Sequence, residues 1–392
     1  MLSPVCGVHL HGTVIKLFGL KDPRPNSMCG IGGYSGNFDP VLLERMNGSL
    51  RHRGPDGEGK VVFGEAGVGL CHRRLAIIDL SPSGAQPMED GTGRAWISFN
   101  GEIYNYLELR RALEARGHRF RSKSDTEVLI RLYLEFGTDM LARLNGIFAF
   151  ALWDAEKKQL FLARDQLGVK PLYYATPTPG FVFASEARAL LHEPSLERAI
   201  DREALNPAQQ SLTTRRPQEL LRGIKRLEPG CAMVVRNGKI ERSWRYYDLP
   251  QPGHSFFRSD AEAVEATRES VRQAVHRQMI ADVPVAALLS GGLDSSGVVA
   301  FAKEVAPGGH IACFTAAMDS DAMREEGFVD DLPYARRVAQ HLDVPLHEVP
   351  ISSGDFLSAQ DFLAQADFPI VDPAAFNTYF LAQAARRGGY KV

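Results

Sequence analysis

The stretch NSMCGIGGYSG, residues 26–36, places a cysteine directly after a methionine and ahead of a glycine-rich apolar run. A thiol is a nucleophile only once deprotonated, so a reactive cysteine needs a nearby base. No Cys–His–Asp arrangement stands out around Cys29, and the nearest downstream histidine is His52. A cysteine that starts a chain carries its own base, because an α-amino group has a pKa of about 7.7–8.0. Cys29 is therefore either a nucleophile released by removal of Met28 or a small buried hydrophobe on a strand.

A second stretch with chemical potential is LLSGGLDSS, residues 288–296, between an apolar run and an expected helix. Its glycines permit close backbone approach, and amides at a helix N-terminus form an anion-binding cradle. Ser290, Ser295 and Ser296 add hydroxyl groups, while Asp294 would tolerate a phosphate that carries Mg²⁺ or cap the helix. No lysine follows the glycines, so this is not a Walker A loop, and the chain has no GxGxxG fingerprint. The plain alternative is a Gly-Gly turn with an aspartate N-cap.

Length and composition exclude several classes of protein. The 392 residues suggest two domains, and a net charge of −2 gives no electrostatic reason to bind nucleic acid or an anionic membrane. Five scattered cysteines without a CxxC pair predict neither a disulfide framework nor a zinc site, and they fit a reducing cytoplasm. The longest apolar runs are too short to span a bilayer. We expect a cytoplasmic protein with no metal cluster of its own and no nucleic-acid or membrane partner.

The elements that must position Cys29 are mostly strands. From Cys29 to about residue 190, β-type runs joined by Gly-, Pro- or Asp-containing turns occupy residues 60–80, 94–105, 146–165 and 171–186. Two helices interrupt them, at 105–117 and 124–137. The second opens with Ser124 and Glu127 in capping-box spacing. Strands in runs with helices grouped between them predict an α+β domain rather than a parallel βα repeat.

The pattern changes in the second half. A hairpin at 231–247 turns at Asn237–Gly238, and residues 248–260 are expected to link two domains. Helices and strands then alternate: helix 260–279, strand 283–290, a helix from Ser295, strand 311–318, helix 333–342 and strand 346–351. This alternation predicts a parallel sheet with nucleotide chemistry at the strand ends. The final YKV is typical of another buried strand, so we expect the chain to be a fragment.

Several motifs occur in a fixed order: MCGIGGYSG, RHRGPDGEG, HRRLAIIDLSPSGAQPM, FNGEIYNYLELR, SDTEVL, LNGIFAFALWD and ARDQLGVKPLYY. Together they resemble the class II glutamine amidotransferase domain, an N-terminal-nucleophile fold. LLSGGLDSS resembles the pyrophosphate loop of the ATP pyrophosphatases, and the pair is similar to the glutamine-hydrolysing asparagine synthetases of bacterial B type over residues 28–392. The resemblance implies an α+β glutaminase domain of sandwiched antiparallel sheets at 29–250. A partial α/β parallel-sheet ATP-pyrophosphatase domain would follow at 256–392, with residues 1–28 as a leader or a mis-assigned start.

The resemblance also implies catalytic roles. Cys29 would attack the side-chain amide of glutamine, with its own amine as the proton shuttle. Asn100 and the amide of Gly101 would form the oxyanion hole. Arg53 and Asp56, in RGPD, would support the site as loop scaffolding. The alternative for Asn100 is a purely structural role as a turn residue before Gly101.

Glutamine would be recognised by the charges on its backbone. The resemblance implies that Arg74 binds the α-carboxylate, that Glu102 and Asp125 bind the α-ammonium group, and that Leu75, Ala76, Ile77 and Ile78 frame the pocket. Alternatively, Arg74 is a surface ion-pair partner and Asp125 belongs only to a helix cap.

In the second half the resemblance implies ATP and Mg²⁺ as cofactors. The residues that would contact ATP are Leu288, Ser290, Gly291, Gly292, Asp294, Ser295 and Ala316, with the leucine and alanine against adenosine. Aspartate would be activated as its β-adenylate and attacked by ammonia, giving asparagine, glutamate, AMP and pyrophosphate. The alternatives are another acceptor, as in sugar-modifying or β-lactam-forming relatives, or a fragment with glutaminase activity only. The implied partners are glutamine, aspartate and ATP, and a homodimer stays open.

The chain departs from the family pattern at both ends. The family starts at the methionine before the cysteine, whereas 27 residues precede Met28 here. We expect the mature protein to begin at Cys29, whether translation starts at Met28 or a segment is cut away. The family's next glycine- and acid-containing loop, expected after KV, does not appear in this sequence. We therefore expect this chain to hydrolyse glutamine better than it makes asparagine.

Overall fold

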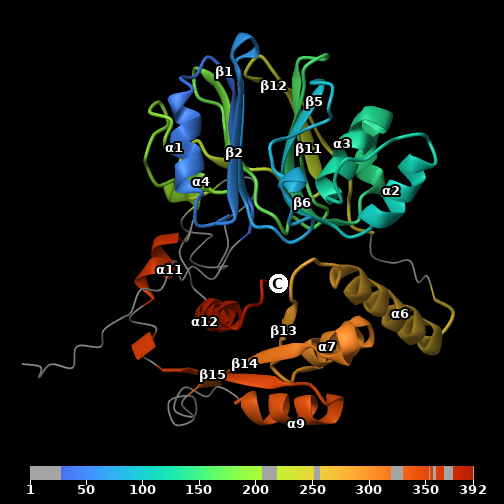
Figure 1. The fold of residues 1–392 in the computed structure, drawn as a ribbon. Coiled ribbons are helices and arrows are strands. Elements are labelled where there is room, and N and C mark those ends of the chain that lie inside the picture. Colours follow the sequence, from blue (N-terminus) through green and yellow to red (C-terminus); the bar gives the residue numbers. More distant parts are fainter. Residues whose placement is uncertain are drawn as a thin grey trace, which may run out of the picture.

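The computed structural model describes residues 28–204, 219–250, 257–318, 330–352, 354–355, 359–365 and 374–391. These residues form two parts, drawn one above the other in Figure 1. Residues 1–27 of the expected leader lie outside the described residues, as do 251–256 of the expected linker. The domain limits at 250 and 256 therefore stay predictions.

The upper part contains two six-stranded antiparallel sheets. The first has the order β10-β8-β9-β1-β3-β2, with β1 Gly30–Gly36, β2 Gly57–Phe63, β3 Val68–Arg74, β8 Tyr173–Ala175, β9 Gly180–Ala184 and β10 Lys225–Arg226. The second has the order β12-β11-β7-β6-β5-β4, with β4 Met88–Glu89, β5 Ala95–Ile103, β6 Gly146–Asp154, β7 Gln159–Arg164, β11 Cys231–Arg236 and β12 Lys239–Arg245. The predicted α+β domain of sandwiched antiparallel sheets is confirmed.

Alternating strand residues build the core of this sandwich. Ile31 and Leu70 of the first sheet and Ala151 and Leu162 of the second belong to one buried cluster between the sheets. The opposite face of the first sheet is covered by α1, Val41–Ser49, and α4, Ala187–Leu190. The second sheet is covered by α2, Tyr106–Glu114, and α3, Asp125–Phe136. Figure 1 shows the resulting order of layers, helix, sheet, sheet and helix.

The predicted helices at 105–117 and 124–137 are confirmed as α2 and α3, but α1 and α4 were not predicted. The sequence of α1, VLLERMNGS, ends in Asn, Gly and Ser, which favour helices poorly, so its helix depends on packing. The capping box was also wrong in detail. Ser124 accepts a hydrogen bond from the amide of Thr126, whereas the carboxylate of Glu127 accepts those of Arg121 and Ser122 in the preceding loop.

The lower part contains a parallel sheet, as predicted. Its order is β13-β14-β15, with β13 Ala286–Leu288, β14 Ala312–Met318 and β15 Leu346–Ile351. The helices are α6 Asp260–Gln278, α7 Leu293–Val305, α9 Leu332–Leu342, α11 Gln360–Gln365 and α12 Ala374–Arg387. Residues of α6, α7 and α9 form one apolar cluster with the sheet, and residues of α12 join a second that contains Phe314. Three helices thus share one cluster while α12 packs in the other.

Some limits in this part differ from the prediction. Strand β13 has three residues, Ala286–Leu288, rather than the predicted eight of 283–290. Helix α7 begins at Leu293 rather than Ser295. Tyr390 and Lys391 of the expected last strand lie in no strand, and Tyr390 packs edge-on against Phe314.

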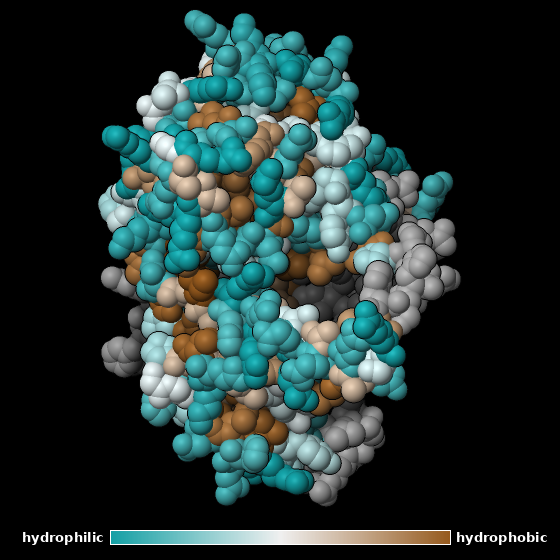
Figure 2. All heavy atoms as spheres, turned by 90° about the vertical axis from the view of Figure 1, so that its right-hand side faces the viewer, coloured by the Kyte–Doolittle hydropathy of each residue, from teal (hydrophilic) through white to brown (hydrophobic). Residues whose placement is uncertain are grey.

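Between the two parts, the surface in Figure 2 has a hollow bordered by hydrophobic residues, while most of this face is hydrophilic. Within the described ranges, no helix combines the length and the apolar character that crossing a membrane requires.

Candidate active site

Cys29 directly precedes β1, which pairs with β3 on one side and β9 on the other. The thiol lies against one residue of the chain that follows β3. The amide of Leu75 donates to Sγ at 3.3 Å, and the thiol donates to the Leu75 carbonyl at 3.5 Å. The short strand-to-loop step after Arg74 therefore fixes where the nucleophile points.

Arg53 and Asp56 support this arrangement as predicted. The Nε of Arg53 donates to the carbonyl of Cys29 at 3.1 Å, and its Nη1 to Glu186 at 2.9 Å. Asp56 accepts the amide of Ala76 at 2.9 Å. His52, the nearest downstream histidine, contacts Glu186 at 2.8 Å and so joins the scaffold around the site.

The environment of the Cys29 thiol does not ionise it. Burial raises the pKa of Cys29 to about 11, although the hydrogen bond from Leu75 and the nearby cations Lys170 and Arg53 oppose the shift. Such a thiol is overwhelmingly protonated near neutral pH, so attack requires a base that removes its proton. This electrostatic state fits the proposal that the base is the α-amine of Cys29 itself.

Lys170 is a site residue that reasoning from the sequence missed. It is buried, its Nζ lies 3.0 Å from Sδ of Met28, and burial lowers its pKa. Its position in ARDQLGVKPLYY, a lysine flanked by valine and a Pro-Leu pair, was the available signal. Its charge favours both the thiolate and a neutral amine at Cys29.

A cavity next to Cys29 collects most of the predicted glutamine pocket. It is lined by Cys29, Arg74, Leu75, Ile77, Ile78, Gly84, Gln86, Phe99, Gly101, Glu102, Ser124, Asp125 and Thr126. Two predicted residues, Ala76 and Asn100, are buried nearby but do not line it. Gly84, Gln86, Phe99, Ser124 and Thr126 were not predicted, and Gln86 is hydrogen-bonded to Thr126. Segments from four separate regions of the sequence thus meet in one cavity.

Arg74 ends β3 and reaches the loop that follows it. Its Nη1 donates to the Ser81 carbonyl at 3.0 Å, and its Nη2 to the carbonyls of Ile78 and Asp79. A Cβ on Gly84 would lie 2.1 Å from Nη2, so only glycine leaves room for the guanidinium there. The alternative of a surface ion pair is not supported, because the guanidinium bonds carbonyls and no carboxylate in the described part of the chain lies within salt-bridge distance of it.

Two carboxylates from different elements supply the negative side of the cavity. Glu102 is on β5, and Asp125 is the first residue of α3, where Oδ2 accepts the amide of Ile103 at 3.0 Å. Burial raises the pKa of Asp125 to about 6. Burial and then the charge of Asp125 raise the pKa of Glu102 well above its usual value. The pair lines the cavity as two desolvated carboxyl groups, whose ionised forms a nearby ammonium group would stabilise.

Asn100 and Gly101 are strand residues rather than turn residues. Asn100 pairs with Ala149 across β5 and β6, and is 1% exposed. Its Nδ2 has no hydrogen-bond partner among the described residues, which is uncommon for a buried amide. A Cβ on Gly101 would lie 2.1 Å from the Ile147 carbonyl, so this position requires glycine. The buried, unpaired amide is the donor that an oxyanion would use.

The Michaelis constant for glutamine is expected to rise below pH 6. Asp125 loses its charge as the pH falls through its raised pKa of about 6, and the attraction for the ammonium group of glutamine is then lost. For one group with a pKa of about 6, the expected rise is about five- to sixfold from pH 6 to pH 5. Steady-state kinetics between pH 5 and 8 measure it. An Asp125→Asn variant should bind weakly throughout with a flatter profile, and a constant that does not change down to pH 5 in the unmodified chain would exclude this role.

The glycine loop of the lower part lies between β13 and α7, as predicted. The hydroxyls of Ser290 and Ser295 are 3.0 Å apart, and the amide of Gly292 donates to Ser290 at 3.4 Å. Gly292 is the N-cap of α7, and no side chain caps this helix, so the alternative in which Asp294 caps it is not supported. Asp294 is exposed in the first turn. The residues present fit a pyrophosphate group, since hydroxyls and a helix N-terminus meet at one loop.

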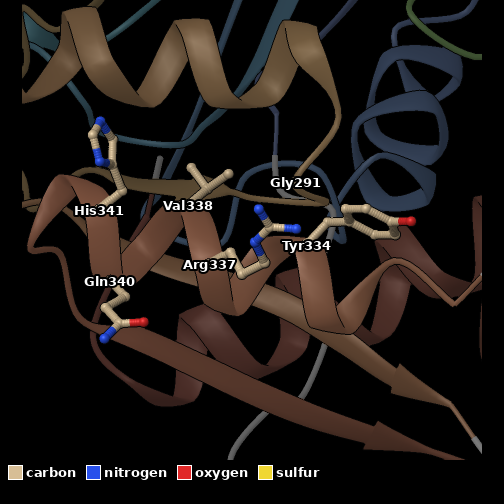
Figure 3. Close-up of a pocket in the computed structure, with 6 residues that line it drawn as sticks. All are labelled: Gly291, Tyr334, Arg337, Val338, Gln340 and His341. Atoms are coloured by element: carbon tan, nitrogen blue, oxygen red, sulfur yellow. The ribbon is translucent and has the colours of Figure 1, made fainter.

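Gly291 packs this loop against α9. Its φ of 81° is in the left-handed region, and a Cβ would lie 2.4 Å from the amide nitrogen of Ala335. Figure 3 shows Gly291 at the end of a depression of about 610 Å³ along α9, which is lined by Tyr334, Arg337, Val338, Gln340 and His341. The two predicted adenosine contacts lie near the ends of adjacent strands: Leu288 pairs with Phe314 of β14, and Ala316 follows two residues later.

Comparison with known proteins agrees with both halves. Residues 28–247 match the family described as glutamine amidotransferase domain, and residues 266–392 match asparagine synthase. The chain is 35% identical over 370 residues to asparagine synthetase [glutamine-hydrolyzing] 1 of Bacillus subtilis, which covers 92% of this chain and 56% of that protein. It is 33% identical over 383 residues to a putative asparagine synthetase [glutamine-hydrolyzing] 2 of Methanocaldococcus jannaschii, covering 92% and 72%. The chain thus spans little more than half the length of the Bacillus relative.

Two other similarities are less direct. Amidase chry2 of Gibberella zeae is 32% identical over 394 residues, covering 93% of this chain and 57% of that protein. Among solved structures, a glutamine phosphoribosylpyrophosphate amidotransferase from B. subtilis covers 82% of this chain and 81% of its own, at 18% identity and a TM-score of 0.43, too loose a likeness to add to the argument. The family matches and the synthetase relatives decide the assignment: the chain belongs to the family of glutamine-hydrolysing asparagine synthetases.

Proposed function

We propose that this chain binds glutamine beside Cys29 and hydrolyses its side-chain amide to glutamate and ammonia. The observation that carries the proposal is the meeting, in one cavity, of the Cys29 thiol with Arg74 on one element and Glu102 and Asp125 on two others. A nucleophile alone would suit any amide. A cation and two carboxylates beside it suit the charged backbone of an α-amino acid.

The reaction begins with the thiol. The free α-amine of Cys29 takes the thiol proton while Sγ attacks the side-chain carbonyl carbon of glutamine. The carbonyl oxygen becomes negatively charged and accepts hydrogen bonds from Nδ2 of Asn100 and the amide of Gly101. The C–N bond then breaks as the protonated amine gives its proton to the leaving ammonia, which leaves a thioester on Cys29. Water attacks the thioester with the amine again as base, and glutamate is released.

The lower part is proposed to use the ammonia. ATP would bind with its pyrophosphate group at Ser290, Gly291, Gly292 and Ser295, and its adenosine near Leu288 and Ala316. Mg²⁺, when bound, would neutralise phosphate charge beside Asp294. Aspartate, activated by ATP as its β-adenylate, would accept the ammonia and yield asparagine. The support is the family assignment together with the loop geometry.

A second candidate keeps both half-reactions and changes the acceptor. A relative named amidase chry2 matches nearly the whole chain at an identity close to that of the synthetases. The glutamine pocket and the glycine loop would serve any acceptor that ATP activates. The acceptor is therefore the part of the proposal that most needs an experiment.

The experiment measures glutamate and pyrophosphate release by a chain that begins at Cys29, with ATP and Mg²⁺ present or absent. Glutamate release is expected without ATP, and slower pyrophosphate release is expected only when aspartate is added. Pyrophosphate release with a different carboxylate acceptor but not with aspartate would support the second candidate. Failure to release glutamate from glutamine would contradict the glutaminase proposal itself.

A further inference from the structure

One wall of the glutamine cavity has little regular structure of its own. Residues 75–79 follow β3 and lie in no helix or strand. Leu75 contacts the thiol, Ile77 and Ile78 line the cavity, and the carbonyls of Ile78 and Asp79 accept from Arg74. The Leu75 end of this wall therefore contacts the thiol, while its Ile78–Asp79 end sets the guanidinium proposed to hold the glutamine carboxylate.

The wall is hydrogen-bonded to the asparagine synthase part of the chain. The amide of Asp282 donates to the Ile77 carbonyl at 3.0 Å. Its carboxylate accepts the amide of Asp79 at 2.8 Å. These two bonds bracket Ile78, one formed by the backbone amide of Asp282 and the other by its carboxylate. Asp282 thus supplies a backbone donor to residue 77 and a side-chain acceptor to residue 79, which lie in no sheet.

A second contact reaches the same wall. Nζ of Lys391 lies 2.8 Å from Oδ2 of Asp56, which accepts the amide of Ala76, and Nζ also donates to the Ala76 carbonyl at 3.5 Å. Figure 1 shows the C-terminal end between the two parts. Residues of the lower part therefore form hydrogen bonds with the wall in two places, at Ala76 and at Asp79.

We propose that Asp282 is a positioning residue of the glutamine pocket, supplied by the opposite part of the chain. This inference rests on the proposed glutaminase function. Without its carboxylate, the amide of Asp79 loses its acceptor and the wall can move away from the cavity. The carbonyls of Ile78 and Asp79 would then carry Arg74 with them, which weakens binding of the glutamine carboxylate while leaving Cys29, Asn100 and Gly101 in place.

The side chain of Asp79 does not offer another explanation for the contact between Asp282 and the wall. The carboxylate of Asp79 is taken by neighbours on its own side, since it accepts the amide and hydroxyl of Ser81 and the amide of Lys123. Asp282 therefore acts on the backbone of the wall rather than on the Asp79 side chain. An amide side chain at position 282 still offers a carbonyl oxygen to the same donor.

The test measures glutamine hydrolysis in chains that begin at Cys29. In Asp282→Ala, the Michaelis constant for glutamine is expected to rise about tenfold with kcat changed less than about threefold, the size expected for one hydrogen bond to a charged group. Asp282→Asn should stay within about threefold of the unmodified constant because it keeps an acceptor. If Asp282→Ala does not fold, Asp282→Glu, which displaces the acceptor by one methylene, should show the same rise.

The matched control is Arg277→Gln, which removes an exposed ion pair at 3.3 Å between Arg277 of α6 and Glu108 of α2. That pair also joins the two parts, but it touches no residue of the wall. The control should leave the Michaelis constant unchanged. An equal rise in the control, or no rise in Asp282→Ala or Asp282→Glu, would overturn the inference, whereas absence of hydrolysis in the unmodified chain would overturn the proposed function instead.

Discussion

A chain that begins at Cys29 is expected to hydrolyse glutamine about 10²–10⁴ times faster than one that retains Met28, the usual contribution of a general base. In the longer chain the nitrogen of Cys29 is an amide and cannot accept a proton. The thiol, with its pKa raised to about 11, then lacks the α-amine proposed to remove its proton. The retained methionine also occupies the space beside Lys170, with Sδ 3.0 Å from Nζ. Glutamate release by the two preparations measures the difference, with intact mass to verify each N-terminus.

Two variants of the shorter chain complete that experiment. Cys29→Ala should release glutamate only at the background rate and so gives the lower limit of the assay. Cys231→Ala, at a cysteine in the core between the sheets, should retain activity and controls for loss of a thiol as such. Full activity in a chain that still carries residues 1–28 would show that the base is a group other than the α-amine.

Local patterns explain which elements could be predicted. The Asn237–Gly238 turn joins β11 to β12, since both residues have the positive φ, 48° and 75°, that such a turn requires. Strand β15 coincides with its predicted range, because an apolar-bounded run between a helix and a loop is a strong local signal. Helix α1 was missed because its sequence favours no helix strongly, and its packing against the first sheet and α4 stabilises it.

The residues of the candidate site also fall into those that a local motif predicts and those that only the fold brings together. The charged residues proposed to contact glutamine, Arg74, Glu102 and Asp125, lie in quoted motifs, and the structure brings all three to one cavity. The role of Asp282 could not be predicted from the sequence. Its hydrogen bonds go to the backbone of residues about 200 positions away. Lys170 is intermediate: it lies within the quoted motif ARDQLGVKPLYY, but the charge it places near Cys29 depends on how β7 and β8 are folded.

Replacing Asn100 by alanine is expected to lower kcat for glutamine hydrolysis by about 10²–10³, the usual cost of one oxyanion donor. The donor Nδ2 is buried and has no partner in the described part of the chain, so the cost of desolvating it is already met before glutamine binds. A hydrogen bond formed only when the carbonyl oxygen becomes charged lowers the barrier rather than the ground state. The Michaelis constant should therefore change by less than about threefold.

Ser98→Ala is the matched control for Asn100. Ser98 lies two residues earlier on the same face of β5, is also fully buried, and its hydroxyl also lacks a partner among the described residues. Loss of a buried polar group from this strand should by itself leave kcat within a few-fold of the value for the unmodified chain. Only loss of a donor that reaches the reacting carbonyl should lower kcat by the larger factor. A rise in the Michaelis constant with unchanged kcat in Asn100→Ala would mean that Asn100 binds glutamine and does not stabilise the oxyanion. The Gly101 amide would then be the one remaining donor, and the rate assigned to the pair would have to come from the backbone of β5 alone.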